Sequence, residues 1–290
     1  MKRIVSALGK LKRGKRAWVV LVLCATTAMA LPAQTFTTLL SFSGPDGENP
    51  YGGLVQGTDG NLYGTTKFGG ASGLGTVFKI TPSGALTTLY NFCSQAGCTD
   101  GHGPMAGLVQ ATNGDFYGTT VYGGANTNPD APDGGGTVFE ITPRGELTVL
   151  YSFCSQSGCT DGEYPVAGLI QASNGDFYGT TSSAGANCSY PCGGTIFKIT
   201  PSGTLTTLHS FCSQPGCTDG GAPFAGLVQA ADGDLYGTTS EGGADGQDGT
   251  VFKITPSGTL TTLYSFCSES GAQTVDTPRC ARPGRQWGLL

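Results

Sequence analysis

Short stretches in which apolar and polar residues alternate recur along the chain from about residue 35. In residues 77–81, for example, Phe78 and Ile80 alternate with Val77, Lys79 and Thr81, which gives an extended segment one strongly apolar face. These stretches are rich in Val, Ile, Thr, Tyr and Phe, and Gly, Pro, Asn or Asp bounds each of them. This composition is typical of β-strands. The pattern therefore predicts an all-β chain of short strands.

Four such stretches return in the same order in four consecutive units. Their motifs are Gly-Leu-Val-Gln, Tyr-Gly-Thr-Thr, Gly-Thr-Val-Phe-Lys-Ile-Thr-Pro and Leu-Thr-Thr-Leu-Tyr-Ser-Phe, with small variations. The first motif begins at Gly53, Gly107, Gly168 and Gly226. Asn-Gly or Asp-Gly turns connect the first two motifs, and Thr-Pro-Ser-Gly or Thr-Pro-Arg-Gly turns connect the last two. Each unit is therefore predicted to be a four-stranded antiparallel meander.

Tandem meanders bury their apolar faces when they stack radially, so the sequence predicts a β-propeller of four-stranded antiparallel blades. A β-solenoid is the alternative, although its coils are much shorter than these units. An extra strand at 35–42 resembles the last strand of each unit, but no blade is left for it to complete, so we expect an incomplete ring. The predicted domain is 31–272, with repeats at about 53–106, 107–167, 168–225 and 226–272 and an atypical tail at 273–290.

The first 30 residues have the layout of a bacterial secretory signal peptide. Seven basic residues precede the apolar run 17–24, and Ala28-Met29-Ala30 offers a cleavage site. An uncleaved anchor is the alternative, but the run is shorter than the roughly 20 residues of a membrane span. A lipid anchor at Cys24 is a further alternative. We expect a secreted protein, extracellular or periplasmic, with no membrane span after signal removal.

Charge narrows the range of partners. Only 12% of the residues are charged, and 49 of the 290 are glycine. Beyond residue 30 the chain has 8 basic and 20 acidic residues, and an acidic surface repels phosphate backbones and anionic lipids. Binding to nucleic acid or to a membrane surface is therefore not expected. We expect a monomer whose partner is a protein, a glycan or a surface ligand.

Ten cysteines follow the signal segment, and six of them belong to the recurring motif Cys-Ser-Gln-x-Gly-Cys-Thr-Asp-Gly. In an exported protein such close pairs predict local disulfides that brace loops. Zinc binding is the alternative, but the pairs belong to different units and four ligands would have to converge. No Cys-x-x-Cys redox motif is present. The predicted pairs are Cys93/Cys98, Cys154/Cys159, Cys188/Cys192 and Cys212/Cys217.

The motif begins once more at Cys267, but Ala272 stands where its second cysteine is expected. Joining the last base of codon 271 to the first two bases of codon 272 can spell Cys, and this frame allows Cys-Thr-Asp-Gly to continue. We hypothesise a one-base deletion near codon 271 that truncated a longer repeat array. Cys267 would then pair with Cys280 or stay unpaired.

These motifs resemble the bacterial GloVer tandem repeat of exported choice-of-anchor proteins, and the resemblance covers residues 35–271. It implies a secreted or surface repeat protein without an assigned biochemical function. A weaker likeness, in Asp59-Gly-Asn-Leu-Tyr and Lys-Ile-Thr-Pro, is to propellers of the virginiamycin B lyase type, which use a metal with histidine and glutamate. This chain has only His102 and His209, in different units and at different motif positions, so the lyase chemistry does not carry over.

The remaining chemistry is sparse. His209 stands where other units have Tyr, which indicates a packing position, whereas His102 lies in a loop. Asp100, Asp161 and Asp219 could ligate Ca²⁺, but they lack the dense acidic spacing of a calcium loop and fit turns better. We predict no catalytic residue, no metal and no cofactor. Specific binding is expected where the units differ, at His102, Tyr122, Asn126, Glu163 and Tyr164.

Three functions remain open from the sequence. The first is an exported, noncatalytic repeat protein that acts as a binding or cell-surface interaction scaffold. The second is a propeller hydrolase or lyase with a site in the central channel, which needs acids or histidines from several blades. The third is a nonfunctional fragment of a longer repeat protein.

Overall fold

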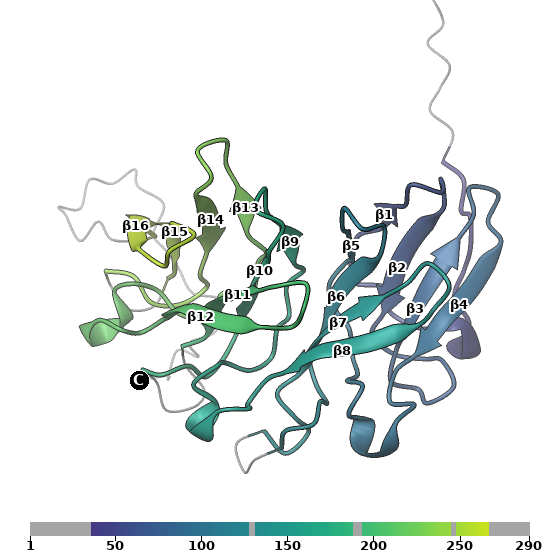
Figure 1. The fold of residues 1–290 in the computed structure, drawn as a ribbon, viewed down its shortest axis with the longest axis horizontal. Coiled ribbons are helices and arrows are strands. Elements are labelled where there is room, and N and C mark those ends of the chain that lie inside the picture. Colours follow the sequence, from purple (N-terminus) through teal and green to yellow (C-terminus); the bar gives the residue numbers. More distant parts are fainter. Residues whose placement is uncertain (1–35, 128–130, 188–192, 245–247, 267–290) are drawn as a thin grey trace, which may run out of the picture. The chain divides into compact units, whose positions relative to one another are not determined.

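The computed structural model describes residues 36–127, 131–187, 193–244 and 248–266. Residues 36–38 belong to a separate N-terminal unit and contain no helix or strand. From residue 39 the chain forms four antiparallel sheets of four strands each, in which each strand pairs with its neighbours in sequence (Figure 1). The fold is an all-β propeller of four blades, as the repeats predict. No helix of the described residues is long and apolar enough to cross a membrane.

The strand bounds are nearly the same in each repeat. Blade 1 contains β1 (Val55–Gln56), β2 (Leu62–Thr66), β3 (Thr76–Ile80) and β4 (Leu86–Asn91). Blade 2 contains β5 (Val109–Gln110), β6 (Phe116–Thr120), β7 (Thr137–Ile141) and β8 (Leu147–Ser152). Blade 3 contains β9 (Ile170–Gln171), β10 (Phe177–Thr181), β11 (Thr195–Ile199) and β12 (Leu205–Ser210). Blade 4 contains β13 (Val228–Gln229), β14 (Leu235–Thr238), β15 (Thr250–Ile254) and β16 (Leu260–Ser265).

A short 3-10 helix precedes the first strand of each blade. The four are η1 (Gly44–Asp46), η2 (Ala96–Cys98), η3 (Ser157–Cys159) and η4 (Pro215–Cys217). The last three coincide with the cysteine motifs, and each contains a glycine with positive φ. The loops between blades are therefore built to one pattern.

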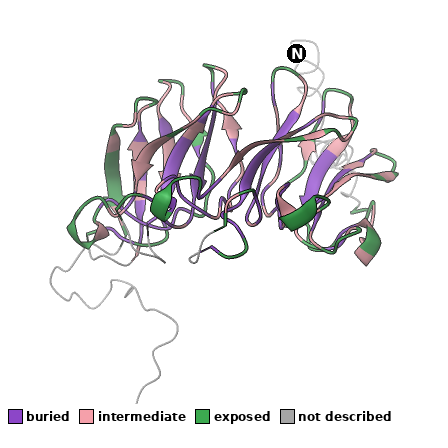
Figure 2. Ribbon diagram, turned by 60° about the horizontal axis from the view of Figure 1, so that its bottom comes forward, coloured by how far each residue is buried: buried purple, intermediate pink, exposed green. Residues whose placement is uncertain are grey.

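The core lies between blades. Three clusters of buried side chains join blade 1 to blade 2, blade 2 to blade 3 and blade 3 to blade 4. In the first cluster the ring of Tyr63 stacks on Phe116 with centroids 4.0 Å apart, and Phe92 meets Phe139 edge-on at 5.2 Å. Figure 2 shows this buried layer within the blades and exposed residues on the connecting loops. Each repeat thus buries its apolar face against its neighbour, as expected of stacked units.

The Tyr-Gly-Thr-Thr motif serves these interfaces residue by residue. In blade 1, Tyr63 provides the interblade stack and Thr65 Oγ1 donates a 2.8 Å hydrogen bond to the carbonyl oxygen of Ala106 in blade 2. The hydroxyls of Thr66 and Thr76 lie 2.8 Å apart across β2 and β3. The glycine is required because a Cβ at Gly64 would lie 2.7 Å from the Phe78 ring. The motif is therefore structural.

The glutamine of Gly-Leu-Val-Gln also joins adjacent blades. The side-chain oxygen of Gln110 accepts a 2.9 Å hydrogen bond from the backbone N–H of Thr58 in blade 1. The same bond links Gln171 to Thr112 and Gln229 to Ser173, at 3.0 Å in both cases. The repeat thus specifies polar as well as apolar contacts between blades.

The segment before blade 1 occupies the place of a preceding outer strand. The Phe42 ring lies 5.0 Å from Phe78, as the Phe92 ring lies 5.2 Å from Phe139. The carbonyl oxygen of Leu39 lies against Gly84, just as the equivalent leucine in blades 1 to 3 lies against the next blade. The described residues 36–42 nevertheless form no strand, and no described strand pairs with them.

Candidate functional site

One hollow of the described surface lies where loops of all four blades come together. It has a volume of about 490 Å³, and residues that follow the second strand or precede the first strand of a blade line it. Because these loops share one end of their blades, the pocket combines positions that are far apart in sequence. The lining residues are Lys67, Met105, Val121, Tyr122, Tyr164, Val166, Ser182 and Phe224.

Two tyrosines from different blades dominate this pocket. The rings of Tyr122 in blade 2 and Tyr164 in blade 3 lie 5.5 Å apart with their planes 63° apart. Phe68, Ser183 and Glu241 occupy the position of Tyr122 in the other units, so the repeat itself does not require a tyrosine there. Tyrosine combines a large apolar ring with a hydroxyl that forms hydrogen bonds. The pair lines the pocket with aromatic surface from two blades.

Tyr164 has a left-handed backbone with a φ of 57°. The equivalent positions hold Asn49, Gly103 and Ala222, all with positive φ. Asparagine and glycine tolerate this region, whereas a bulky residue there is uncommon and carries strain. Strained residues cluster at functional sites, so an observed outlier motivates a functional hypothesis. The loop geometry thus explains the positive φ, but it does not explain the tyrosine.

Lys67 is the cationic residue among those that line the pocket. Its Nζ lies 5.6 Å from the centre of the Tyr51 ring and 5.0 Å from that of Phe68, within the range of cation–π contacts. It forms no ion pair with a carboxylate of the described residues, whereas Lys198 and Lys253 pair with Asp176 and Asp234. The ammonium of Lys67 therefore keeps hydrogen-bond donors for a bound molecule.

The predicted binding residues differ in where they lie. Tyr122 and Tyr164 line the pocket, and the His102 ring stacks on Tyr122 with centroids 5.4 Å apart. Burial lowers the pKa of His102, although Asp133 and Asp100 oppose this shift. Asn126 instead donates a 2.8 Å hydrogen bond to the Ser152 carbonyl oxygen and so braces its loop.

Glu163, the last of the predicted binding residues, does not line the pocket. It is buried, and its backbone forms an isolated antiparallel bridge with Ser183.

The six residues that line the pocket beside Tyr122 and Tyr164 were not predicted from the sequence. Their signal is variation directly after Tyr-Gly-Thr-Thr, as in Lys67 and Val121, and directly after the proline that precedes each first strand, as in Met105. Differences between the repeats at these positions indicate a binding site only when the structure shows that the loops lie around one pocket.

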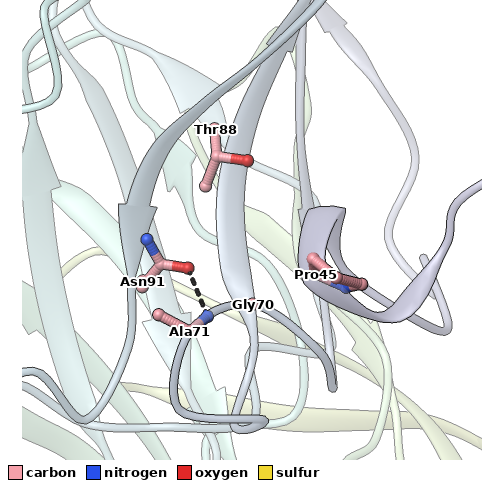
Figure 3. A pocket seen from close by; sticks show the side chains of 5 residues that line it. All are labelled: Pro45, Gly70, Ala71, Thr88 and Asn91. Atoms are coloured by element: carbon pink, nitrogen blue, oxygen red, sulfur yellow. Dashed lines mark hydrogen bonds between the residues drawn. The ribbon is translucent and has the colours of Figure 1, made fainter.

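A second hollow, of about 440 Å³, lies within blade 1 and is lined by Pro45, Gly70, Ala71, Thr88 and Asn91 (Figure 3). The Asn91 side-chain oxygen accepts a 2.8 Å hydrogen bond from the backbone N–H of Ala71. Ser152 and Ser210 accept the equivalent bonds in blades 2 and 3. The Asn91 side chain therefore stabilises a loop in the same way as its equivalents in the other blades.

The cysteine loops contain three of the predicted disulfides, Cys93–Cys98, Cys154–Cys159 and Cys212–Cys217. Cys188, Cys192, Cys267 and Cys280 lie outside the described residues. Cys154, Cys159 and Glu163 come close enough together to suggest metal ligands, but the two sulfurs are bonded to each other. Since metals bind the thiolate, this group does not fit a metal site.

The aspartate of each Cys-Thr-Asp-Gly loop organises that loop. Oδ2 of Asp100 accepts hydrogen bonds from the Tyr90 hydroxyl at 2.8 Å and from the Ser94 backbone N–H at 2.9 Å. In blade 3 the residue equivalent to Tyr90 is His209, and its Nε2 lies 3.0 Å from Asp219 Oδ2. His209 also packs on Phe211, with ring centroids 5.1 Å apart. The predicted packing position therefore has a polar contact as well.

Asp219→Asn is expected to change how stability depends on pH. Burial raises the pKa of Asp219, but hydrogen bonds from His209 and Ser213 outweigh it and hold the pKa at about 2, below the ordinary 3.8. The ionised form therefore stabilises the fold above about pH 4, and this contribution is lost as the pH falls towards 2. Melting temperatures between pH 6 and 2 should fall less steeply for the variant than for the wild type.

The matched control is Asp232→Asn, because Asn113 and Asn174 occupy the equivalent turn position in blades 2 and 3. It should keep the steeper wild-type profile. Parallel profiles for wild type and Asp219→Asn would contradict a stabilising charge at Asp219.

The repeat sequence decides the family. A model of the Gloeobacter/Verrucomicrobia repeat matches residues 26–159 and again residues 98–289. The chain belongs to the Gloeobacter/Verrucomicrobia repeat family. This confirms the resemblance seen in the motifs. In this Gloeobacter/Verrucomicrobia repeat protein, the residues that recur in the repeats build the blades and the interfaces between them. No curated protein matches the chain.

Solved structures similar to this repeat protein are distant. A candidate gluconolactonase is 16% identical over 72% of this chain and 61% of its own, with a TM-score of 0.43. A protein of unknown function from Dyadobacter fermentans is 11% identical over 76% and 69%, with a TM-score of 0.48. A luciferin-regenerating enzyme is 11% identical over 76% and 75%, with a TM-score of 0.41. The chain thus spans less than two thirds of the first of these proteins, and no activity is carried over from them.

Proposed function

We propose that the protein is an exported, noncatalytic binding scaffold that holds a neutral sugar residue in the pocket of Tyr122 and Tyr164. The observation that carries the proposal is the pair of tyrosine rings, contributed by two blades, at a place where the repeat requires neither. The three disulfides support export because they persist in oxidising compartments.

The chemistry of the lining favours a sugar. The C–H face of a sugar ring is apolar and can lie on an aromatic ring, while its hydroxyls need hydrogen-bond partners. The Tyr122 hydroxyl, the Ser182 hydroxyl and the Lys67 ammonium provide such partners around an otherwise apolar wall. An anionic polymer fits less well because the chain beyond residue 30 carries many more acidic than basic residues. A neutral oligosaccharide is therefore the preferred ligand class.

The same lining supports binding rather than hydrolysis. Hydrolysis of a glycosidic bond ordinarily uses two carboxyl groups on either side of the bond. The described residues that line the pocket include no carboxylate, imidazole or thiol. The His102 ring contacts Tyr122, and its lowered pKa favours the neutral imidazole. The pocket therefore holds its ligand without groups placed to cleave it.

An array of neutral oligosaccharides, followed by calorimetric titration of the best binder, tests this proposal. We expect Tyr122→Ser and Tyr164→Asn each to weaken binding at least about tenfold, because aromatic anchors dominate binding energy. Each substitution introduces a residue that another blade has at the same position, Ser183 or Asn49, so the backbone is preserved.

The control is Tyr264→Ala, which removes an exposed tyrosine outside the pocket and should leave affinity unchanged. Melting curves show whether each variant remains folded. Sugar binding that survives both pocket substitutions, or the absence of any bound oligosaccharide, would refute the proposed site.

A further inference from the structure

One side of blade 4 exposes residues whose equivalents in blades 1 to 3 are buried or half-buried against a neighbour. Phe266 is 43% exposed, whereas Phe92, Phe153 and Phe211 at the same repeat position are fully buried. Most residues of the outer strand β16 are exposed as well (Figure 2). The exposed members of this surface, here called the trailing face of blade 4, are Val228, Leu263, Tyr264 and Phe266.

The three internal interfaces show what such a face accepts. In each interface, three residues of one blade pack on the next blade. They are the tyrosine of the second strand, the Val or Ile that follows the first Thr of the third strand, and the phenylalanine that follows the fourth strand; in blade 1 these are Tyr63, Val77 and Phe92. Their partners there are the Leu directly before the first strand, Phe or Leu from the second strand, and Phe and Ile from the third. The trailing face of blade 4 therefore has the residue types that, in blades 1 to 3, pack on the following blade.

Blade 1 carries the complementary surface. Leu54 is 53% exposed, whereas Leu108, Leu169 and Leu227 at the same position are buried against a preceding blade. Leu62, which corresponds to the stacked Phe116, is only partly buried. Together with Phe78 and Ile80 these residues form what is here called the leading face of blade 1. One chain therefore presents both halves of the interface that it builds three times internally.

Part of the leading face is already covered. Phe42 lies on Phe78, in the place that Phe266 of an incoming blade 4 would take. The segment 39–42 forms no strand in the described structure, so no ladder of sheet hydrogen bonds holds it there. This segment therefore covers the leading face as a cap, and an incoming β16 can take its place.

We propose that the trailing face of blade 4 binds the leading face of blade 1 of a second copy, which displaces residues 39–42 of that copy. The contact is head-to-tail, so the faces left at the two ends either meet in a closed ring or add further copies. Removal of the cap strengthens the association, because the cap and the incoming blade compete for Phe78. This inference departs from the monomer expected at the outset, and it does not depend on sugar binding.

Light scattering on the size-exclusion eluate, over a range of loading concentrations, measures the association. We expect the mass of the full mature chain to rise from one copy to two or more. A variant without residues 36–42 should reach the same mass at a concentration at least about tenfold lower. Phe266→Asp should remain a single copy, and because Phe266 is exposed, its circular dichroism spectrum should match that of the wild type.

Phe224→Ser is the matched control, since Phe224 is an exposed aromatic residue that lines the pocket and lies outside both faces. It should associate as the wild type does. A paired variant, Leu62→Cys with Tyr236→Cys, checks the register, because these positions correspond to the stacked rings of Phe116 and Tyr63. An oxidised dimer linked through these two cysteines is expected.

A single-copy mass at every concentration, with and without residues 36–42, overturns the proposal. That result would include the case in which another part of the same chain covers the trailing face. Association that persists in Phe266→Asp, or that gives no cross-link between the two cysteines, overturns it as well.

Discussion

Phe153→Ala is expected to lower the free energy of unfolding by about 3–5 kcal/mol, the usual cost of removing a buried aromatic side chain. Phe153 is fully buried, and its ring meets Phe197 of blade 3 edge-on at 5.2 Å. It also lies 5.3 Å from Tyr151, so the cavity would open between two blades. Urea denaturation followed by circular dichroism measures the change.

The control is the same substitution at the same repeat position of blade 4. Phe266 is 43% exposed, so Phe266→Ala should cost less than about 1 kcal/mol. The two variants remove the same atoms, and they differ only in whether a neighbouring blade covers them. Equal losses of stability would contradict the description of the interblade core.

Gly118→Ala is expected to destabilise the fold by about 1–3 kcal/mol or more, although alanine suits a strand no worse than glycine. An added Cβ would lie 2.6 Å from the tip of the Phe139 ring and 2.8 Å from a methyl group of Leu108. Both neighbours are buried in the interface between blades 1 and 2, so neither can move freely. Denaturant midpoints measure the effect.

Gly53→Ala is the matched control for this substitution. No atom lies within 4 Å of a Cβ at Gly53. It should therefore change stability by no more than about 0.5 kcal/mol, as surface substitutions usually do. If both variants were equally stable, crowding at the second strand would not explain the glycine of Tyr-Gly-Thr-Thr.

Much of the fold could be predicted from the sequence because the repeat displays each strand four times. Alternation in residues 77–81 and the Pro-Ser-Gly turn after them identify two strands and their connection without any long-range information. The extra segment at 35–42 was expected as a strand with no blade to complete. In the structure Phe42 packs as an outer strand does, but the described residues include no third strand that pairs with this segment.

The interblade contacts could not be read from the sequence. Gln110 and Thr58 are 52 positions apart, and only the stacking of blades brings the amide oxygen to the backbone N–H. The contact of His209 with Asp219 could not be predicted either, because it depends on how a disulfide loop folds. Local patterns predict strands and turns well, whereas the partners of polar side chains follow from the arrangement of the units.

The pocket was only partly foreseen for a similar reason. Tyr122 and Tyr164 are visible as departures from the repeat, and the structure brings their rings together. Lys67 and Phe224 enter the pocket from the first and last blades, so no sequence neighbourhood connects them. Asn126 also stood out, yet it serves a loop brace that recurs at Asn187. Differences between the repeats therefore indicate candidate residues. The structure shows which of these residues lie together in the pocket.

Hydrogen–deuterium exchange with and without the best-binding neutral oligosaccharide locates the ligand on the intact chain. We expect slower exchange in the loops around Tyr122 and Tyr164, where the ligand covers the backbone, and no change in the outer strands β4, β8 and β12. Protection confined to the outer strands or to the disulfide loops, with the two tyrosine loops unaffected, would contradict the proposed binding site.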